Sequence, residues 1–243
     1  ARLRAIKKQY AQAPFRPAKH ADHSYPGEPE KLAAYFNEML RTARGGGGRA
    51  FPNLRGLVAP HIDFARGAVT YGYAYSALPE GFSAKLVVIL GTGHHVKDHA
   101  FVLTEKDFET PFGTVKTSKE AVERLVRACG EDLIVDQYEH KNEHSVEFQV
   151  VFLRHLLGEG FEILPILCGA FPFPSPKEPG PWDSEEICTF VENLKEIVEE
   201  ASPQCLVVSG VDFAHVGPRF GDPFAVDLSL LQEVEASDRN LLE

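Results

Sequence analysis

Four histidines of this sequence stand just after apolar runs that are typical of buried strands: His61, His94, His95 and His215. Neutral imidazole is the commonest metal ligand, and it is also a ready general base near neutral pH. The carboxyl ends of parallel strands lie at one edge of a sheet, where open α/β folds bind their ligands. We therefore expect these histidines to share one cleft that binds a metal ion or moves a proton. The alternative is that each is an isolated loop histidine with a backbone partner.

Two aspartates lie close to these histidines in the sequence, and each has two interpretations. Asp212 precedes His215 by three residues. It either holds one tautomer of a His215 that acts as general base, or it caps the turn after the strand. Asp63 lies two residues past His61. It either reaches the cleft or caps the helix that we expect to begin near Gly67.

A third group of polar residues stands near the start of a predicted helix. His144 and Glu147 are three positions apart and share a helix face, with Glu143 beside them in the first turn. One interpretation is a second wall of the cleft that relays a proton or orients a ligand. The other is an acid that compensates the helix dipole and a surface pair. The spacing is not His-Glu-x-x-His, which excludes a zinc peptidase of that type.

Other motifs and the composition exclude several classes of protein. The turn Gly91-Thr92-Gly93 lacks the third glycine of a dinucleotide-binding fingerprint, and neither a Gly-x-Ser-x-Gly elbow nor a phosphate-binding loop is present. The 243 residues are 44% hydrophobic and 25% charged, as in a globular protein. Their net charge is −10, from 25 basic and 35 acidic residues. Such a surface repels phosphate backbones, so we expect no dedicated nucleic-acid binder.

The sequence also predicts a cytoplasmic protein with no membrane partner. No apolar run approaches the roughly 18–20 residues that a membrane span needs, and no apolar stretch follows the basic amino terminus to make a secretory signal. The cysteines are far apart and form no Cys-x-x-Cys pair, which favours reduced, mostly buried thiols. They are Cys129, Cys168, Cys188 and Cys205.

The elements that must position these residues alternate along the chain. Short apolar runs predict strands at 54–59, 85–90, 100–104, 133–137, 161–167 and 205–211. Helical spacing predicts helices from residue 29 to the glycines at 45–48, and at about 67–78, 118–129, 142–157, 183–200 and 224–243. Ser118 and Asn142 are the expected caps of two of them. Residues 1–27 show little periodicity, and a proline-rich loop occupies 172–181. This order predicts an α/β fold of three layers, with a largely parallel or mixed central sheet and helices on both faces.

Five motifs in a fixed order resemble the Memo family, whose bacterial and archaeal members are called AmmeMemoRadiSam system protein B. The resemblance runs from about Arg16 to at least Gly217 and includes Arg16-Pro17-Ala18 and Tyr25-Pro26-Gly27 near the amino terminus. The motifs are Ala59-Pro60-His61, Leu90-Gly91-x-Gly93-His94-His95, Thr110-Pro111-Phe112-Gly113, Glu143-His144-Ser145-x-Glu147 and Ser209-x-x-Asp212-Phe213-x-His215-x-Gly217.

The resemblance implies a fold similar to class III extradiol dioxygenases, which use non-haem Fe(II) to cleave aromatic diols. It implies that His61 and His94 are metal ligands, that His215 is the catalytic base and that His144 acts from the cleft wall. Fe(II), another divalent ion or copper would be the cofactor. The cleft-lining residues would be Asp63, His95, Glu147 and Asp212. The implied function is a metal-dependent oxidoreductase, and the alternative is a non-enzymatic binding or scaffold protein that uses the same cleft for a peptide or small ligand.

The sequence departs from the family pattern in places that concern the metal. Ile62-Asp63-Phe64 replaces the usual Ala-Gly-Tyr, and Thr92-Gly93 replaces Pro-Ser. The family's third metal position is a Cys or an acid near the carboxyl end, and no match follows His215. We expect one domain over residues 1–243 that either continues into a further carboxyl-terminal segment or lacks a complete ligand set. In either case we expect residues 1–243 to hold little or no metal, with Asp63 as the fallback oxygen donor.

Overall fold

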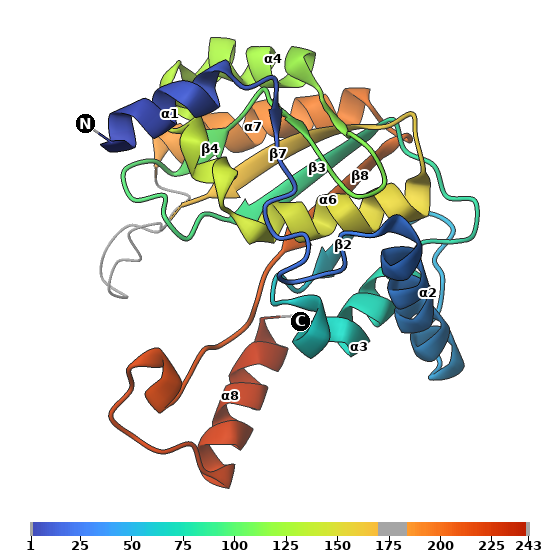
Figure 1. The fold of residues 1–243 in the computed structure, drawn as a ribbon. Helices are drawn as coiled ribbons and strands as arrows, with labels where there is room; N and C mark the ends of the chain where they lie inside the picture. Colours follow the sequence, from blue (N-terminus) through green and yellow to red (C-terminus); the bar gives the residue numbers. More distant parts are fainter. Residues whose placement is uncertain (1, 170–183, 242–243) are drawn as a thin grey trace. The chain divides into compact units, whose positions relative to one another are not determined.

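The structure, a computed structural model, describes residues 2–169 and 184–241 (Figure 1). It divides into two units, Ala1–Gly210 and Val211–Glu243, which are described separately. The expectation of a single domain over 1–243 stays a prediction. The proline-rich loop at 172–181 lies outside the described residues.

A six-stranded sheet forms the centre of the first unit. All its strand pairs are parallel except β4–β7, so the predicted α/β fold with a mostly parallel sheet is confirmed. The strand order is β2 (Gly56–Ala59), β8 (Cys205–Gly210), β3 (Leu86–Thr92), β7 (Glu162–Cys168) and β4 (Phe101–Leu103), with β6 (Lys116–Thr117) also paired to β7.

Helices cover both faces of this sheet because the side chains of its central strand alternate between two apolar cores. Val87 and Ile89 of β3 pack into one core with α2 (Pro29–Gly45), α3 (Phe64–Ser76) and α6 (His144–Leu157). Leu86 and Val88 pack into the other core with α4 (Lys119–Cys129) and α7 (Glu185–Glu200). Figure 1 shows the resulting helix–sheet–helix layers.

The strand predicted at 133–137 is wrong. The chain there forms a short helix, α5 (Asp132–Val135), followed by the 3₁₀ helix η1 (Gln137–Lys141). Leu133 is buried in the second core, while Val135 is 64% exposed. A single helical turn is therefore enough to bury Leu133. A run this short has no periodicity that separates a strand from a helical turn.

The amino-terminal segment contains structure that the sequence did not predict. It begins with α1 (Arg2–Gln12) and continues into β1 (Phe15–Arg16), which pairs with β5 (Asp107–Phe108) as a separate two-stranded sheet. In the second unit, the helical spacing at the end of the chain corresponds to α8 (Leu228–Asn240), which Asp227 caps. Among the described residues, no helix combines the length and the apolar character that a membrane span requires.

Candidate metal centre

Three histidines come together at the carboxyl edge of the sheet. His61 follows β2, His94 follows β3, and His144 is the first residue of α6. One nitrogen from each ring lies within 4.8 Å of the others. The ring centroids are 5.1 Å apart for His61 and His94, and 4.8 Å apart for His94 and His144. The structure thus brings His144, which the family resemblance places in the cleft wall, next to His61 and His94 at the edge of the sheet.

The third histidine reaches this edge because α6 begins very close to the strand ends. A Cβ on Gly91 would lie 2.6 Å from a methyl group of Val146, so only glycine allows this approach of helix and strand. The Ser145 hydroxyl then donates to the carbonyl of Thr92 at 2.9 Å. The Gln149 amide donates to the carbonyl of Pro60, also at 2.9 Å, next to His61. The first turns of α6 are therefore fixed to the ends of β3 and β2.

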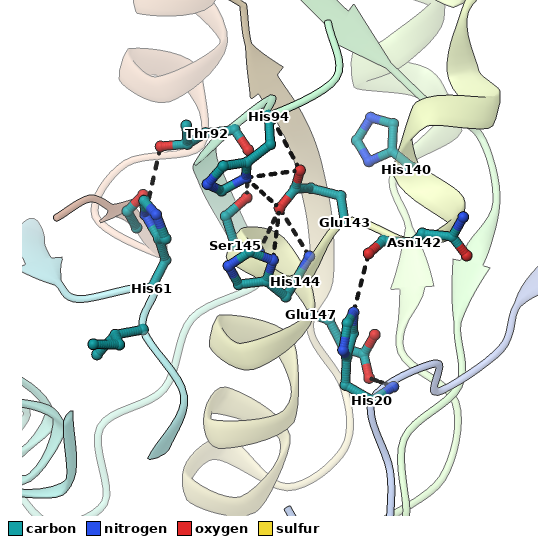
Figure 2. A network of polar contacts seen from close by, with 12 residues as sticks. His20, His61, Thr92, His94, His140, Asn142, Glu143, His144, Ser145 and Glu147 are labelled. Carbon is teal, nitrogen blue, oxygen red and sulfur yellow. Dashed lines mark hydrogen bonds and ion pairs between the residues drawn. The ribbon is translucent and has the colours of Figure 1, made fainter. Parts of the chain in front are cut away.

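Glu143 connects the histidines to the helix and caps it. Its carboxylate accepts hydrogen bonds from the backbone N–H groups of His144 at 2.8 Å and Ser145 at 3.0 Å. It also accepts from the backbone and from Nδ1 of His94, each at 3.1 Å. Figure 2 shows this carboxylate between the rings of His94 and His144. The predicted cap Asn142 is therefore wrong by one residue, because the longer Glu143 side chain reaches the helix N–H groups and the ring together.

The Nδ1 atoms of His61 and His94 face hydrogen-bond acceptors, and Nδ1 of His144 lies close to a carboxylate. Nδ1 of His61 is 3.0 Å from the carbonyl oxygen of Gly210, a β8 residue. Nδ1 of His144 is 3.3 Å from the carboxylate of Glu143, which also accepts from His94. A carbonyl or carboxylate can only accept, so Nδ1 of His61 and of His94 carries the proton and the lone pair of each ring is on Nε2. Metal-binding histidines in proteins are held in the same way.

The electrostatics of the site keep Glu143 ionised and His144 neutral. Burial opposes the charge of Glu143, but the hydrogen bonds from His94 and the Ser145 N–H outweigh it and lower the pKa to about 2. Burial lowers the pKa of His144 to about 4, against the attraction of Glu143 and together with repulsion from His94 and His61. A neutral imidazole is the form that binds a metal ion.

A sequence model of the Memo-like protein family matches residues 16–243. The chain belongs to the Memo family. A MEMO1 family protein of Aquifex aeolicus is 31% identical over 228 residues, which cover 94% of this chain and 56% of that protein. One of Methanopyrus kandleri is 30% identical over 207 residues, covering 82% and 68%, and one of Thermus thermophilus is 29% identical over 228 residues, covering 94% and 63%. The chain therefore spans between about half and two-thirds of these curated relatives.

Asp63 and His95, two further residues of the Memo motifs, lie outside the group of ligating atoms found among the described residues. Asp63 is the N-cap of α3 and accepts from the backbone N–H of Arg66 at 3.1 Å, while its other oxygen pairs with the guanidinium at 2.5 Å. The capping interpretation therefore holds, and α3 begins at Phe64 rather than near Gly67. His95 is exposed.

Glu147, which we expected to line the cleft, is buried instead, with 1% of its surface exposed. Its carboxylate pairs with the fully buried Arg16 and accepts from the Tyr25 hydroxyl at 2.5 Å and the backbone of His20 at 2.9 Å. It therefore anchors the amino-terminal segment to α6. The expectation failed because the partner, Arg16, lies far away in the sequence.

His215 and Asp212 belong to the second unit and lie in one turn. Nε2 of His215 is 3.4 Å from a carboxylate oxygen of Asp212, and the ring packs against Phe220 with centroids 4.8 Å apart. The imidazole is half exposed. The short contact that the spacing suggested is therefore present, and the role of His215 at the cleft stays a prediction.

Proposed function

We propose that His61, His94 and His144 bind a transition-metal ion and that the protein is a metal-dependent oxidoreductase resembling non-haem iron extradiol dioxygenases. The observation that supports this is the gathering of the three rings: one nitrogen of each lies within 4.8 Å of the others, and Nδ1 of His61 and of His94 is held by a protein acceptor.

The donor set fits such an ion. Imidazole nitrogen suits iron, copper, nickel and zinc, and three protein ligands with room for substrate are typical of catalytic centres. The side chains of His94 and His144 are 37% and 32% exposed, so small molecules reach the group from solvent. Fe(II), another divalent ion or copper is the proposed cofactor.

A bound Fe(II) would supply redox chemistry with dioxygen, and the residues of the chain would handle the protons. Glu143 keeps a proton on Nδ1 of His94. His215 is the proposed base. Its Nε2 lies 3.4 Å from a carboxylate oxygen of Asp212, and the ring would take the proton of a substrate hydroxyl. His144 would then act as a ligand rather than from the cleft wall.

A non-enzymatic binding or scaffold function is the second candidate, and one observation favours it. Non-haem iron oxygenases commonly use two histidines and one carboxylate. The ligand group found among the described residues contains three histidines and no acid. The cleft would then hold a peptide or small ligand, with the metal as a structural or binding element.

Oxygen uptake distinguishes the two candidates. The chain is loaded with Fe(II) under anaerobic conditions and then exposed to dioxygen with catechol, and separately with a non-aromatic diol as a control. A dioxygenase consumes equimolar oxygen and catechol, and His94→Ala removes the activity while His95→Ala preserves it. Stoichiometric iron without oxygen uptake on catechol would contradict the dioxygenase-like function and favour the binding function.

A further inference from the structure

A polar pocket of about 400 Å³ lies at the end of α6 opposite the candidate metal centre. Residues 114–116, residues 158–162 and Arg154 line it. Arg154 is ten residues after His144, which places the pocket about 15 Å along the helix from the histidines. Glu162 is the first residue of β7, so the pocket is at the amino edge of the sheet. The candidate metal centre lies at the carboxyl edge.

Arg154 is the residue that gives this pocket its chemistry. Its side chain is only 8% exposed, and Nη2 donates to a carboxylate oxygen of Glu159 at 2.9 Å. Its Nε–H is buried and has no acceptor within the part of the chain that the structure describes. A buried donor of a charged group without a partner is unfavourable. Of the two donors at this edge of the guanidinium, only Nη2 therefore has an acceptor among the described residues.

The motif Thr110-Pro111-Phe112-Gly113, which the metal centre does not involve, passes close to the Arg154 guanidinium. It forms a tight turn in which the Thr110 hydroxyl donates to the Gly113 carbonyl at 2.6 Å. Gly113 has a φ of +103°, and a Cβ there would lie 3.1 Å from Nη2 of Arg154. Glycine at this position thus allows the positive φ of the turn and also leaves space for the guanidinium of Arg154.

The arrangement of donors and acceptors indicates what binds here. Nε–H and Nη2 point from the same edge of a guanidinium, and a carboxylate or phosphate binds both at once. Glu159 uses Nη2 alone, and its side chain is 88% exposed, so it can leave at little cost. Lys116 adds a second positive charge to the lining and Glu162 a second negative one. Displacement of Glu159 leaves the pocket with a net positive charge.

We propose that this pocket binds a small organic molecule through an oxyanion, a carboxylate or a phosphate, held by Nε–H and Nη2 of Arg154. Glu159 occupies the position of that anion in the free protein and swings into solvent when the ligand enters. A space of about 400 Å³ exceeds the need of a bare ion and falls in the range of small-molecule sites.

Titration calorimetry at constant ionic strength tests the proposal, with inorganic phosphate and succinate as the probes. We expect one of them to bind, which identifies the anion. We expect Glu159→Gln to tighten that binding about tenfold, because the competing carboxylate is gone. Arg154→Lys keeps the charge but loses the paired donors, so we expect binding to weaken tenfold or more. Glu38→Gln breaks a similarly exposed ion pair with Arg41 and should change nothing.

Two results would overturn the proposal. One is the absence of binding of either probe to both the wild type and Glu159→Gln. The other is equal affinity in the wild type and Glu159→Gln. Because Glu159 is exposed, its variant folds, and thermal denaturation of each variant separates lost binding from lost structure.

Discussion

Both carboxylate oxygens of Glu143 lie 3.1 Å from Nδ1 of His94, although the two residues are 49 positions apart. The same carboxylate caps α6, whose first residue is His144. The Glu143 carboxylate thus caps the helix and also contacts both candidate ligands, His94 and His144. The orientation of His94 and the start of α6 should therefore change together when Glu143 is replaced.

Replacing the carboxylate by an amide tests this connection. We expect Glu143→Gln to lower the affinity for a divalent metal about 10–100-fold, because the amide is a poorer acceptor for the imidazole N–H and carries no charge. The free energy of unfolding should fall by about 1 kcal/mol through the weaker cap. Metal titration and urea denaturation of the same preparation measure the two effects.

Ser184→Ala is the matched control, because it removes a side-chain cap from α7, on the opposite face of the sheet. We expect a similar loss of about 1 kcal/mol with unchanged metal affinity. Equal metal affinities in the wild type and Glu143→Gln would show that the carboxylate only caps the helix.

The buried pair of Arg16 and Glu147 should matter for stability and not for the metal. Arg16 is fully buried and also donates to the carbonyls of His140 and Glu143. Glu147→Gln leaves its guanidinium without a countercharge, so we expect a loss of about 3–5 kcal/mol in urea denaturation.

The exposed pair of Arg41 and Glu38 provides the comparison, since Glu38→Gln should cost about 1 kcal/mol or less. The metal affinity of Glu147→Gln should equal that of the wild type. If Glu147→Gln had normal stability but bound metal poorly, Glu147 would act at the metal site and not in the buried ion pair.

His140 should make the protein less stable in acid. Its Nε2–H donates to the Val102 carbonyl at 3.0 Å, and its Nδ1 is buried. Burial lowers its pKa from 6.5 to about 4; the Val102 hydrogen bond opposes this and the charge of Arg16 adds to it. Between these values the unfolded chain binds a proton that the folded chain does not, so stability falls as the pH falls from 6.5 towards 4. The full effect is about 3 kcal/mol.

His140→Gln removes this titration and keeps a donor for the carbonyl. Between pH 7 and pH 4.5, we expect its unfolding free energy to fall about 2–3 kcal/mol less than that of the wild type. His23→Gln removes an exposed histidine and should follow the wild-type curve. Parallel curves for the wild type and His140→Gln would mean that His140 is not buried as a neutral ring.

His215 is predicted to act on substrate and not on the metal or the fold. It is half exposed, so His215→Ala should change the unfolding free energy by less than about 0.5 kcal/mol. We expect unchanged metal content and no oxygen uptake with catechol. Full activity in a stable His215→Ala protein would end its role as the base.

The layers of the fold could be predicted because the strands β3, β7 and β8 are long apolar runs in a regular order. The strands β1, β5 and β6 could not, because a strand of two residues has no period and depends on distant partners. The helix α1 could not be predicted for a related reason, because its apolar residues are few.

The candidate site was predictable only to the extent that it follows from the strand ends. The sequence predicts His61 and His94 at one edge because each follows a strand and the carboxyl ends of parallel strands lie together. His144 lies next to them because α6 approaches β3 closely at Gly91. The spacing of residues in the sequence does not predict this approach. Glu143 was recognised only as an acid of the first turn. The sequence therefore indicated a missing third ligand where the structure brings in an imidazole.

The metal stoichiometry of single histidine variants tests the central claim most directly. Chelator-treated protein is dialysed against Fe(II) without oxygen, and bound metal is counted by elemental analysis. We expect about one ion per chain in the wild type and in His95→Ala, and a loss of most of it in His61→Ala, His94→Ala and His144→Ala alike. A His144→Ala protein that retains a full ion per chain would contradict the three-histidine centre.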